Sequence, residues 1–212
     1  MINFSKYKAI LWDFDGVIMD SMSIRDKGFE VTLSNFPKEQ VQQLLDFHRL
    51  NGGLSRYVKF RYFYEEILKE PITEEIVMSY ASRFSEVMMD LLIDEKLLIK
   101  DSLKFIQKYH QQVPMHIVSG SDGRELNKIC GRLDIAKYFV TIQGSPTPKK
   151  ELVKNLLLDF KYEHSNVVFI GDSINDFEAA NDNSLEFFGY NNFYLKSIAN
   201  NYIESFSNLV AI

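Results

Sequence analysis

Hydrophobic residues in this chain form short continuous runs, separated by longer stretches in which they recur every three or four positions. Runs rich in Ile, Val and Phe lie at residues 8–14, 115–120 and 166–171, and each ends at Gly, Ser or Asp. Such runs are typical of strands buried on both faces of a parallel sheet. We predict strands there, and two further strands at residues 137–144 and 185–190.

The periodic stretches predict helices. Residues 101–112 and 149–160 carry apolar side chains at one-turn spacing. Strands therefore alternate with helices over residues 97–190, which predicts an α/β fold with a Rossmann-like, doubly wound parallel sheet. The polar, Asn-rich residues 191–212 are left unassigned as a tail.

Residues 18–95 break this alternation, because their pattern indicates helices only. The predicted helices cover residues 24–36, 37–51, 55–69 and 73–93. Pro37 suits a first helical turn, and Thr73 suits a helix cap. We expect a core built from residues 1–17 and 96–212, with an all-helical cap inserted at 18–95.

Composition narrows the function classes. The 212 residues are enough for one domain with an insert, and a net charge of −5 without a basic block argues against nucleic-acid binding. Cys130 is the single cysteine, so we expect no intrachain disulfide and a cytoplasmic location. No run approaches the roughly 18 apolar residues of a membrane span. A small-molecule partner fits best, and the oligomeric state stays open.

Polar residues appear where the predicted strands end, and in open α/β sheets ligands bind beyond those carboxyl ends. The residues at these ends are Asp13 and Asp15, then Ser119 with Gly120, then Lys149 and Lys150, and finally Asp172 and Asp176. We expect them to converge in one crevice.

The chemistry of this crevice points to a phosphoryl group. Asp13 and Asp15 lie two residues apart and share one side, so with Asp172 they would repel one another unless a hard cation such as Mg²⁺ lay between them. A lysine beside a cation is reasonable when an anion sits between the two. A phosphoryl group fits, with further hydrogen bonds from the Ser119 hydroxyl and the Gly120 amide.

Asp13 is then the candidate nucleophile, attacking phosphorus to form an aspartyl-phosphate that water later cleaves. Asp15 would first protonate the leaving alkoxide and afterwards deprotonate the water, a role worth roughly 10²- to 10⁴-fold in rate.

The stretches "DFDGVIMDS", "HIVSGS", "TPKKE" and "GDSINDFEAA" occur in this order. They resemble the four motifs of the haloacid dehalogenase superfamily of phosphohydrolases, in the helical-cap subgroup of phosphoglycolate phosphatases and β-phosphoglucomutases. The resemblance implies the nucleophile Asp13, the acid/base Asp15 whose backbone carbonyl also binds Mg²⁺, and the metal-binding Asp172 with Asp176 beside it. It also implies that Ser119 and a lysine bind phosphate.

Two details of the resemblance leave choices open. Proline usually follows the motif lysine, whereas here Pro148 precedes it, so Lys149 and Lys150 compete; the spacing from Gly144 favours Lys149. In the predicted cap, "GLSR" places Gly53 and Arg56 in a stretch similar to the substrate-contacting loop of sugar-phosphate mutases with this cap. A surface salt bridge is the alternative for Arg56.

We therefore expect a Mg²⁺-dependent phosphatase that acts on a small phosphorylated metabolite. A phosphomutase would use the same aspartates. A signalling receiver domain is disfavoured, since its phosphorylated Asp would follow a mid-chain strand of a shorter domain. A partner-binding protein with a residual site is disfavoured by the complete residue set. The four histidines show no metal-ligand spacing, and we assign them no chemistry.

Overall fold

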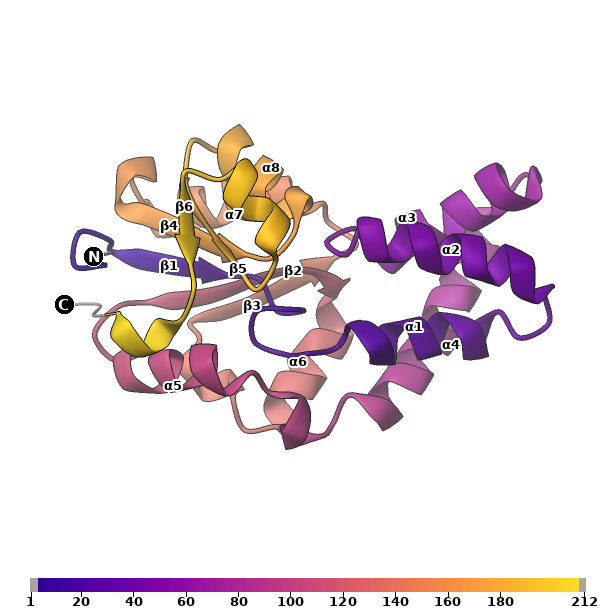
Figure 1. Ribbon diagram of the computed structural model, residues 1–212, viewed down its shortest axis with the longest axis horizontal. Coiled ribbons are helices and arrows are strands. Elements are labelled where there is room, and N and C mark those ends of the chain that lie inside the picture. The colour runs from indigo at the N-terminus through magenta and orange to yellow at the C-terminus, as the bar shows by residue number, and fades with distance from the viewer. Residues whose placement is uncertain (1–3, 210–212) are drawn as a thin grey trace.

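A computed structural model describes residues 4–209 and contains, within them, a parallel sheet of six strands in the order β3-β2-β1-β4-β5-β6 (Figure 1). The strands are β1 (Ala9–Trp12), β2 (Met115–Asp122), β3 (Thr141–Ser145), β4 (Val167–Gly171), β5 (Glu186–Tyr190) and β6 (Asn201–Ile203). The five predicted strands are confirmed. The strand order reverses between β1 and β4, which is where ligands bind in sheets of this type.

Helices cover both faces of this sheet, as a doubly wound fold requires. Helices α5 (Lys100–Tyr109) and α6 (Gly123–Arg132) lie on one face, and α7 (Lys149–Phe160) and α8 (Ile174–Asp182) lie on the other (Figure 1). Strand β1 alternates between them: Ile10 and Trp12 belong to the buried cluster on the α5 side, and Ala9 and Leu11 to the cluster on the α7 side. The continuous apolar run of β1 follows from this double burial.

Four consecutive helices, α1 to α4, stand beyond the carboxyl ends of the strands (Figure 1). They are α1 (Met22–Thr32), α2 (Lys38–Leu50), α3 (Arg56–Tyr62) and α4 (Glu74–Leu91). Their shared interior is aromatic: Phe29 packs against Phe60 and Phe84, with ring centroids 5.5 and 4.5 Å away. The helical insert after β1 is thus present, and its limits at 18 and 95 remain a prediction.

Local details of these helices differ from the prediction. The expected helix over residues 55–69 is α-helical only to Tyr62 and continues as a π-helix, η1 (Phe63–Leu68). The wider turn lets Phe63 and Tyr64, although adjacent, both contact Phe36. Pro37 lies at the N-cap of α2, one residue before the first turn. The Thr73 cap of α4 is confirmed, because its side chain accepts a hydrogen bond from the Ile76 amide.

The unassigned tail is structured as far as residue 209. It contains the 3₁₀ turns η5 (Phe193–Ser197) and η6 (Phe206–Asn208), and β6 adds a sixth strand in parallel beside β5. Phe206 packs against Trp12, with ring centroids 5.4 Å apart. The tail therefore completes one edge of the sheet and part of the core on the α5 face.

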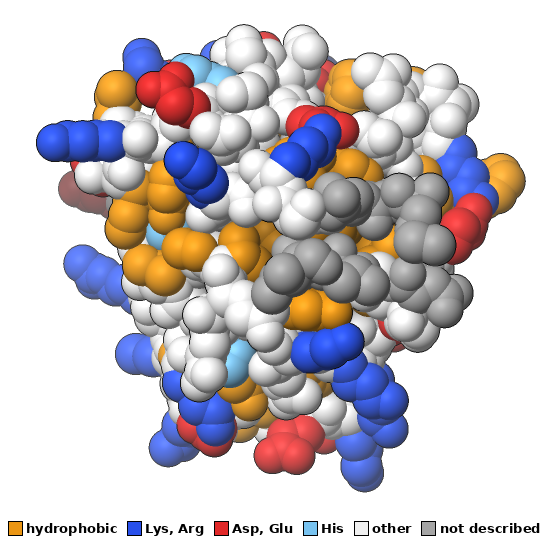
Figure 2. Space-filling model, turned by 90° about the vertical axis from the view of Figure 1, so that its left-hand side faces the viewer, with side chains coloured by type: hydrophobic (Ala, Val, Ile, Leu, Met, Phe, Trp, Pro, Cys, Tyr) orange, Lys and Arg blue, Asp and Glu red, His pale blue; other side chains and the backbone are white. Residues whose placement is uncertain are grey.

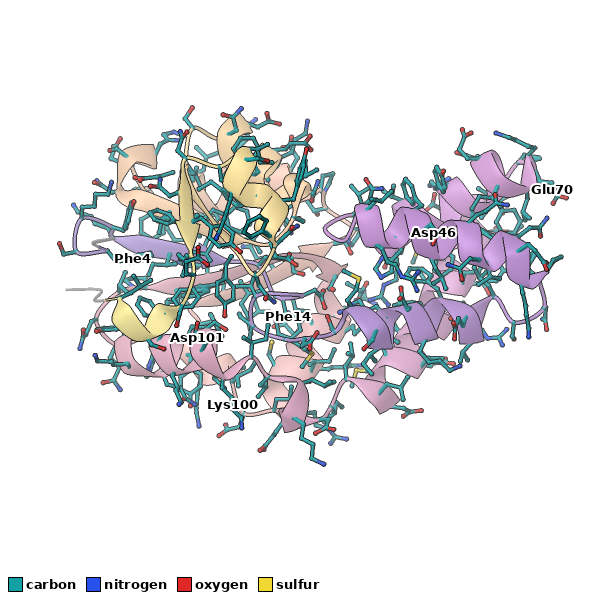
Figure 3. All side chains as sticks on the ribbon, viewed as in Figure 1. Phe4, Phe14, Asp46, Glu70, Lys100 and Asp101 are labelled. Carbon is teal, nitrogen blue, oxygen red and sulfur yellow. The ribbon has the colours of Figure 1, made fainter. Side chains whose placement is uncertain are left out.

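Charged groups are mixed on the face at the amino ends of the strands. Figure 2 shows a band of hydrophobic side chains on this face, with Lys and Arg side chains around it and fewer Asp and Glu side chains among them. Figure 3 places Phe4 near the amino end of β1, where it is buried, and Glu70 at the far end of the helical insert. None of the described helices is long and apolar enough to cross a membrane.

Candidate active site

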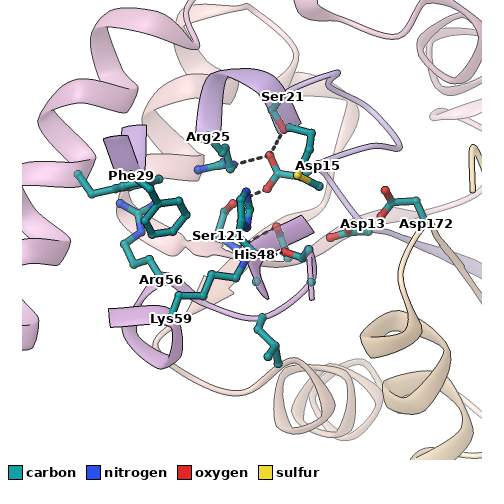
Figure 4. A pocket seen from close by; sticks show the side chains of 17 residues that line it. Asp13, Asp15, Ser21, Arg25, Phe29, His48, Arg56, Lys59, Ser121 and Asp172 are labelled. Atoms are coloured by element: carbon teal, nitrogen blue, oxygen red, sulfur yellow. Dashed lines mark hydrogen bonds and ion pairs between the residues drawn. The ribbon is translucent and has the colours of Figure 1, made fainter. Parts of the chain in front are cut away.

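A small cavity of about 30 Å³ lies where the strand ends meet α1, α2 and α3 (Figure 4). The sheet contributes Asp13 and Asp15 after β1, residues 119–121 from β2, and Asp172 after β4. The helical insert contributes the remaining lining residues. The predicted crevice is therefore present, and it is closed on the side of the helices.

Asp13 is buried at the end of β1 beside Lys149. The Lys149 Nζ atom donates to Asp13 Oδ1 at 3.0 Å and also bonds Asp176. Burial, and then the charge of Asp176, raises the pKa of Asp13 above its usual range despite Lys149. Lys150, in contrast, is exposed. Of the two competing lysines, the structure brings Lys149 to the carboxylates.

Asp13, Asp172 and Asp176 each offer a carboxylate oxygen, and these three atoms lie within 4.8 Å of one another. Burial raises the pKa of Asp172 well above its ordinary value, and the charge of Asp13 adds to the effect. This crowding depends on Gly16, whose φ is +77° and whose added Cβ would lie 1.9 Å from Asp172 Oδ2. Concentrated oxygen ligands with raised pKa values fit a hard divalent cation.

Asp176 has other contacts within this cluster. One oxygen bonds Lys149, and the other accepts hydrogen bonds from the Ser173 amide at 3.0 Å and the Ser173 hydroxyl at 2.6 Å. Ser173 in turn accepts from the Asp176 amide, which makes a capping box at the start of α8. Both oxygens of Asp176 are thus engaged in holding Lys149 and the helix start.

Asp15 is held in a different network, formed with residues that the sequence analysis did not select. Its carboxylate accepts from Ser21, from Arg25 Nε at 2.7 Å and from Ser121 Oγ at 2.5 Å (Figure 4). Burial alone would raise the pKa of Asp15, but Arg25 and the two hydroxyls outweigh it and lower the pKa to about 2. Asp15 is therefore ionised in this arrangement.

The Ser119 side chain is buried within β2, which continues to Asp122, and its Oγ accepts from the Ser121 amide at 3.1 Å. Gly120 lies directly under the helical insert, because a Cβ added there would come within 2.2 Å of the Gly53 carbonyl oxygen. Of the three residues predicted to bind phosphate, Ser119 and Gly120 line the cavity, whereas Lys149 contacts Asp13 and is not among the lining residues. Gly53 of the predicted cap loop closes over Gly120.

Arg56 forms a salt bridge, as the alternative predicted, but the side chain is buried rather than at the surface. Its Nη1 lies 2.7 Å from Glu125 Oε2 and donates to Ser85 Oγ at 2.6 Å. The other Glu125 oxygen accepts from Arg25 Nη1 at 3.1 Å. Glu125 of α6 thereby joins two arginines from α1 and α3.

The site residues that the sequence analysis did not select differ in whether the sequence contained a signal for them. Ser121 lies two residues after Ser119 on the same strand, so strand alternation was a signal that it shares the site. Glu125 offered no such signal, because it meets Arg25 across 100 positions of sequence. Contacts between residues so far apart in the sequence are determined by tertiary packing.

The family model for haloacid dehalogenase-like hydrolases matches residues 10–190, and the chain belongs to this family. No curated protein matches the sequence significantly.

Solved structures with the same fold include a protein in complex with phosphate, a mutase and a predicted phosphatase. CbbY from Rhodobacter sphaeroides, in complex with phosphate, superposes with a TM-score of 0.78 at 15% identity, covering 97% of this chain and 98% of that one. β-Phosphoglucomutase from Clostridium difficile gives 0.74 at 17% identity, covering 94% and 92%. A predicted phosphoglycolate phosphatase from Haemophilus somnus gives 0.75 at 17% identity, covering 96% of each chain.

Proposed function

We propose that this protein is a phosphatase that hydrolyses a small phosphorylated metabolite through an aspartyl-phosphate on Asp13. The observation that carries the proposal is the position of Asp13, buried at the strand end with its Oδ1 3.0 Å from Lys149 Nζ and close to Asp172. A carboxylate in this place is a nucleophile, and the groups around it are suited to hold phosphate oxygens.

Lys149 and Ser119 would bind the phosphoryl group. The Lys149 ammonium is held by Asp176. Burial would lower the pKa of Lys149, but the charges of Asp13 and Asp176 outweigh burial and raise it, so Lys149 stays charged. It can therefore donate charge-assisted hydrogen bonds to the equatorial phosphate oxygens. The buried Ser119 hydroxyl and the Gly120 amide would add neutral donors. We assign Asp176 mainly to positioning Lys149.

Asp15 would work in two steps. As the structure holds it, Asp15 is ionised, which is the form that removes a proton from the attacking water in the second step. To protonate the leaving alkoxide in the first step it must carry a proton, and this requires release from Arg25. Arg25 belongs to α1, so movement of the helical insert would provide that release.

The helical insert would act as a cap. A cavity of about 30 Å³ has space for roughly two water molecules and is too small for a phosphate ester. Helices α1 to α3 must therefore move away to admit a substrate. Their closure around the substrate, with a wider cavity than the one described, would exclude bulk water from the reacting groups.

Asp13 and Asp172 would hold a Mg²⁺ ion, together with the Asp15 backbone carbonyl. The ion would neutralise charge on the phosphoryl oxygens. Its presence would also keep Asp13 ionised, because a nearby cation lowers the pKa of a carboxylate.

The test is a phosphate-release screen with Mg²⁺ over sugar phosphates, short phosphorylated acids and nucleotides. We expect release from at least one ester, and a loss of at least roughly 1,000-fold in Asp13→Asn. Asp20→Asn is the matched control, since Asp20 is exposed in the same turn and should leave activity intact.

Two results would contradict the proposal. Activity that survives in a folded Asp13→Asn variant would reject Asp13 as nucleophile. Conversion of a sugar phosphate to an isomer without release of inorganic phosphate would identify a phosphomutase instead.

A further inference from the structure

Two polar side chains at the cap end of the cavity have no explanation in the chemistry of Asp13. Lys59 of α3 is 3% exposed, and His48 of α2 is 1% exposed. Figure 4 shows both extending toward the middle of the pocket, on the side opposite Asp172. Buried groups of this kind are normally paired, because burial without a partner costs free energy.

His48 lacks a hydrogen bond at either ring nitrogen among the described residues. Its ring packs against Phe29 with centroids 5.0 Å apart, and Nε2 lies 3.8 Å from Asp26 Oδ1, which is beyond hydrogen-bond reach. Burial, and then the charge of Lys59, lowers the pKa of His48 to about 2. His48 is therefore a neutral ring with an N–H available to a ligand.

Lys59 is a buried amine without an acidic partner. Its Nζ donates to the Gly52 carbonyl at 3.1 Å and forms no ion pair within residues 4–209. Burial, and then the charge of Arg25, lowers the pKa of Lys59 to about 7. A nearby anion would reverse this shift and make the charged form favourable.

Among the described charged groups near Lys59, the positive charge of Lys59 is the one that no carboxylate balances. Arg25 and Arg56 are matched by Asp15 and Glu125, with nitrogen–oxygen distances of 2.7 to 3.1 Å in their ion pairs. This set is two positive charges against two negative charges. Each arginine nevertheless keeps one buried Nη2 without a hydrogen bond. Glu125 Oε2 and Asp26 Oδ1 also lack a hydrogen bond here, but both carboxylates are ion-paired with arginines. Among the described residues, Lys59 is thus the charge at the cap end of the pocket without a counter-charge.

We propose that Lys59 and His48 form a subsite for a second anionic group of the substrate, separate from the phosphoryl group at Asp13. This rests on the proposed phosphatase function and narrows its substrate class. The substrate is a short phosphate ester whose other end carries a carboxylate or a second phosphate. Closure of the cap brings Lys59 onto that anion, so the correct substrate favours the closed form.

The first test compares three phosphate esters of the same carbon chain that end in a carboxylate, a second phosphate or a hydroxyl. We expect kcat/KM for one charged-ended ester to exceed that of the hydroxyl-ended ester by roughly 10- to 100-fold. The better of the two charged esters identifies the anion. Equal kcat/KM for all three would overturn the subsite while leaving the phosphatase intact.

The second test removes the charge of the lysine. Lys59→Met should lower the preference for the charged-ended ester by roughly 10-fold or more, chiefly through KM, and Lys59→Arg should retain most of it. Lys27→Met is the control, because Lys27 is exposed and pairs with Glu30 at the surface. A Lys59→Met variant that lowers activity on all esters equally would show a structural role and overturn the proposal.

A binding measurement tests this inference independently of the proposed function. The charged-ended ester is titrated by calorimetry into Asp13→Asn and into Asp13→Asn combined with Lys59→Met, both with Mg²⁺. We expect the second protein to bind roughly 10-fold or more weakly. Equal affinity would overturn the subsite even if the enzyme is active. If the wild type hydrolyses no ester, the proposed function fails, and this titration still decides the subsite.

Discussion

At the scale of single residues, the site contains two aspartates of the same motif in opposite electrostatic states. Burial, and then the charge of Asp176, raises the pKa of Asp13. At Asp15, Arg25 and two hydroxyls outweigh burial and lower the pKa to about 2. These two aspartates lie only two positions apart in the sequence. The roles that we propose for them, a metal-dependent nucleophile and a proton carrier, rest on these different surroundings.

The lowered pKa of Asp15 predicts a pH dependence of stability. Because its folded pKa lies below its ordinary value of 3.8, Asp15 contributes stability above about pH 4 and loses it as the pH falls to about 2. The loss should be about 2 kcal/mol. Urea denaturation with EDTA at pH 5, 3 and 2 should show it as the difference between the wild type and Asp15→Asn, because the raised pKa values of Asp13 and Asp172 change the stability of both proteins in the opposite direction.

Asp15→Asn should lack this part of the pH dependence, whereas Asp159→Asn, at an exposed position, should keep it. Identical slopes for Asp15→Asn and the wild type would show that Arg25 does not hold the Asp15 carboxylate in solution.

At the scale of elements, close approach of helices shapes the insert. Helices α1 and α4 meet at Gly28, where an added Cβ would lie 2.4 Å from Met88 Cε and 2.8 Å from Phe84 Cε2. This is a packing requirement inside a helix, where glycine is otherwise unfavourable. Phe84 also lies under the Arg56 guanidinium, 4.7 Å from its ring centroid. The contact between two cap helices therefore supports a wall of the pocket.

Two alanine substitutions test this packing. Gly28→Ala should destabilise the protein by about 1–3 kcal/mol because overpacking exceeds the gain in helix propensity. Gly131→Ala in α6 should stabilise it by up to about 1 kcal/mol, since no atom lies within 4 Å of the added Cβ. Urea denaturation of both variants measures the difference. A stabilised Gly28→Ala variant would show that Met88 and Phe84 move aside easily.

At the scale of the whole molecule, the site joins distant parts of the chain at one end of the sheet. Asp13, Lys149 and Asp172 follow three different strands, and Arg25 and Arg56 reach the same place from the insert. Without a cation, the raised pKa values of Asp13 and Asp172 mean that the folded state holds protons which the unfolded state gives up. Folding stability therefore falls as the pH rises above about 4.

A bound divalent cation should reverse this loss. At about 100 times its dissociation constant, Mg²⁺ should stabilise the protein by about 2.7 kcal/mol, or roughly 5–10 °C in Tm, and more at pH 8 than at pH 5 because protons compete for the carboxylates. Calorimetry with Mg²⁺ and with EDTA measures the shift.

Asp172→Asn should abolish most of the shift, and Asp159→Asn should retain it. A Tm that is the same with Mg²⁺ and EDTA would argue against a metal site at this cluster.

The sequence by itself determined the sheet and the residues at the ends of its strands. Apolar runs buried on both faces are distinctive, so β1 and β4 were predictable, and so was the arrival of Asp13 and Asp172 at one edge. The three-residue strand β6 was missed, because "NYI" has no apolar run and gains its place only by pairing with β5. The π-helical turn at Phe63 was missed because its apolar spacing resembles that of an α-helix.

Only the tertiary structure decided how the insert meets the sheet. The choice of Lys149 over Lys150 and the contact of Arg25 with Asp15 depend on which side chains face one another across the cavity. So do, within residues 4–209, the lack of an acidic partner for Lys59 and of a hydrogen bond for His48. Local patterns report the period of a strand or a helix. They carry no information about the partner of a buried charge, because that partner lies far away in the chain and is set by packing.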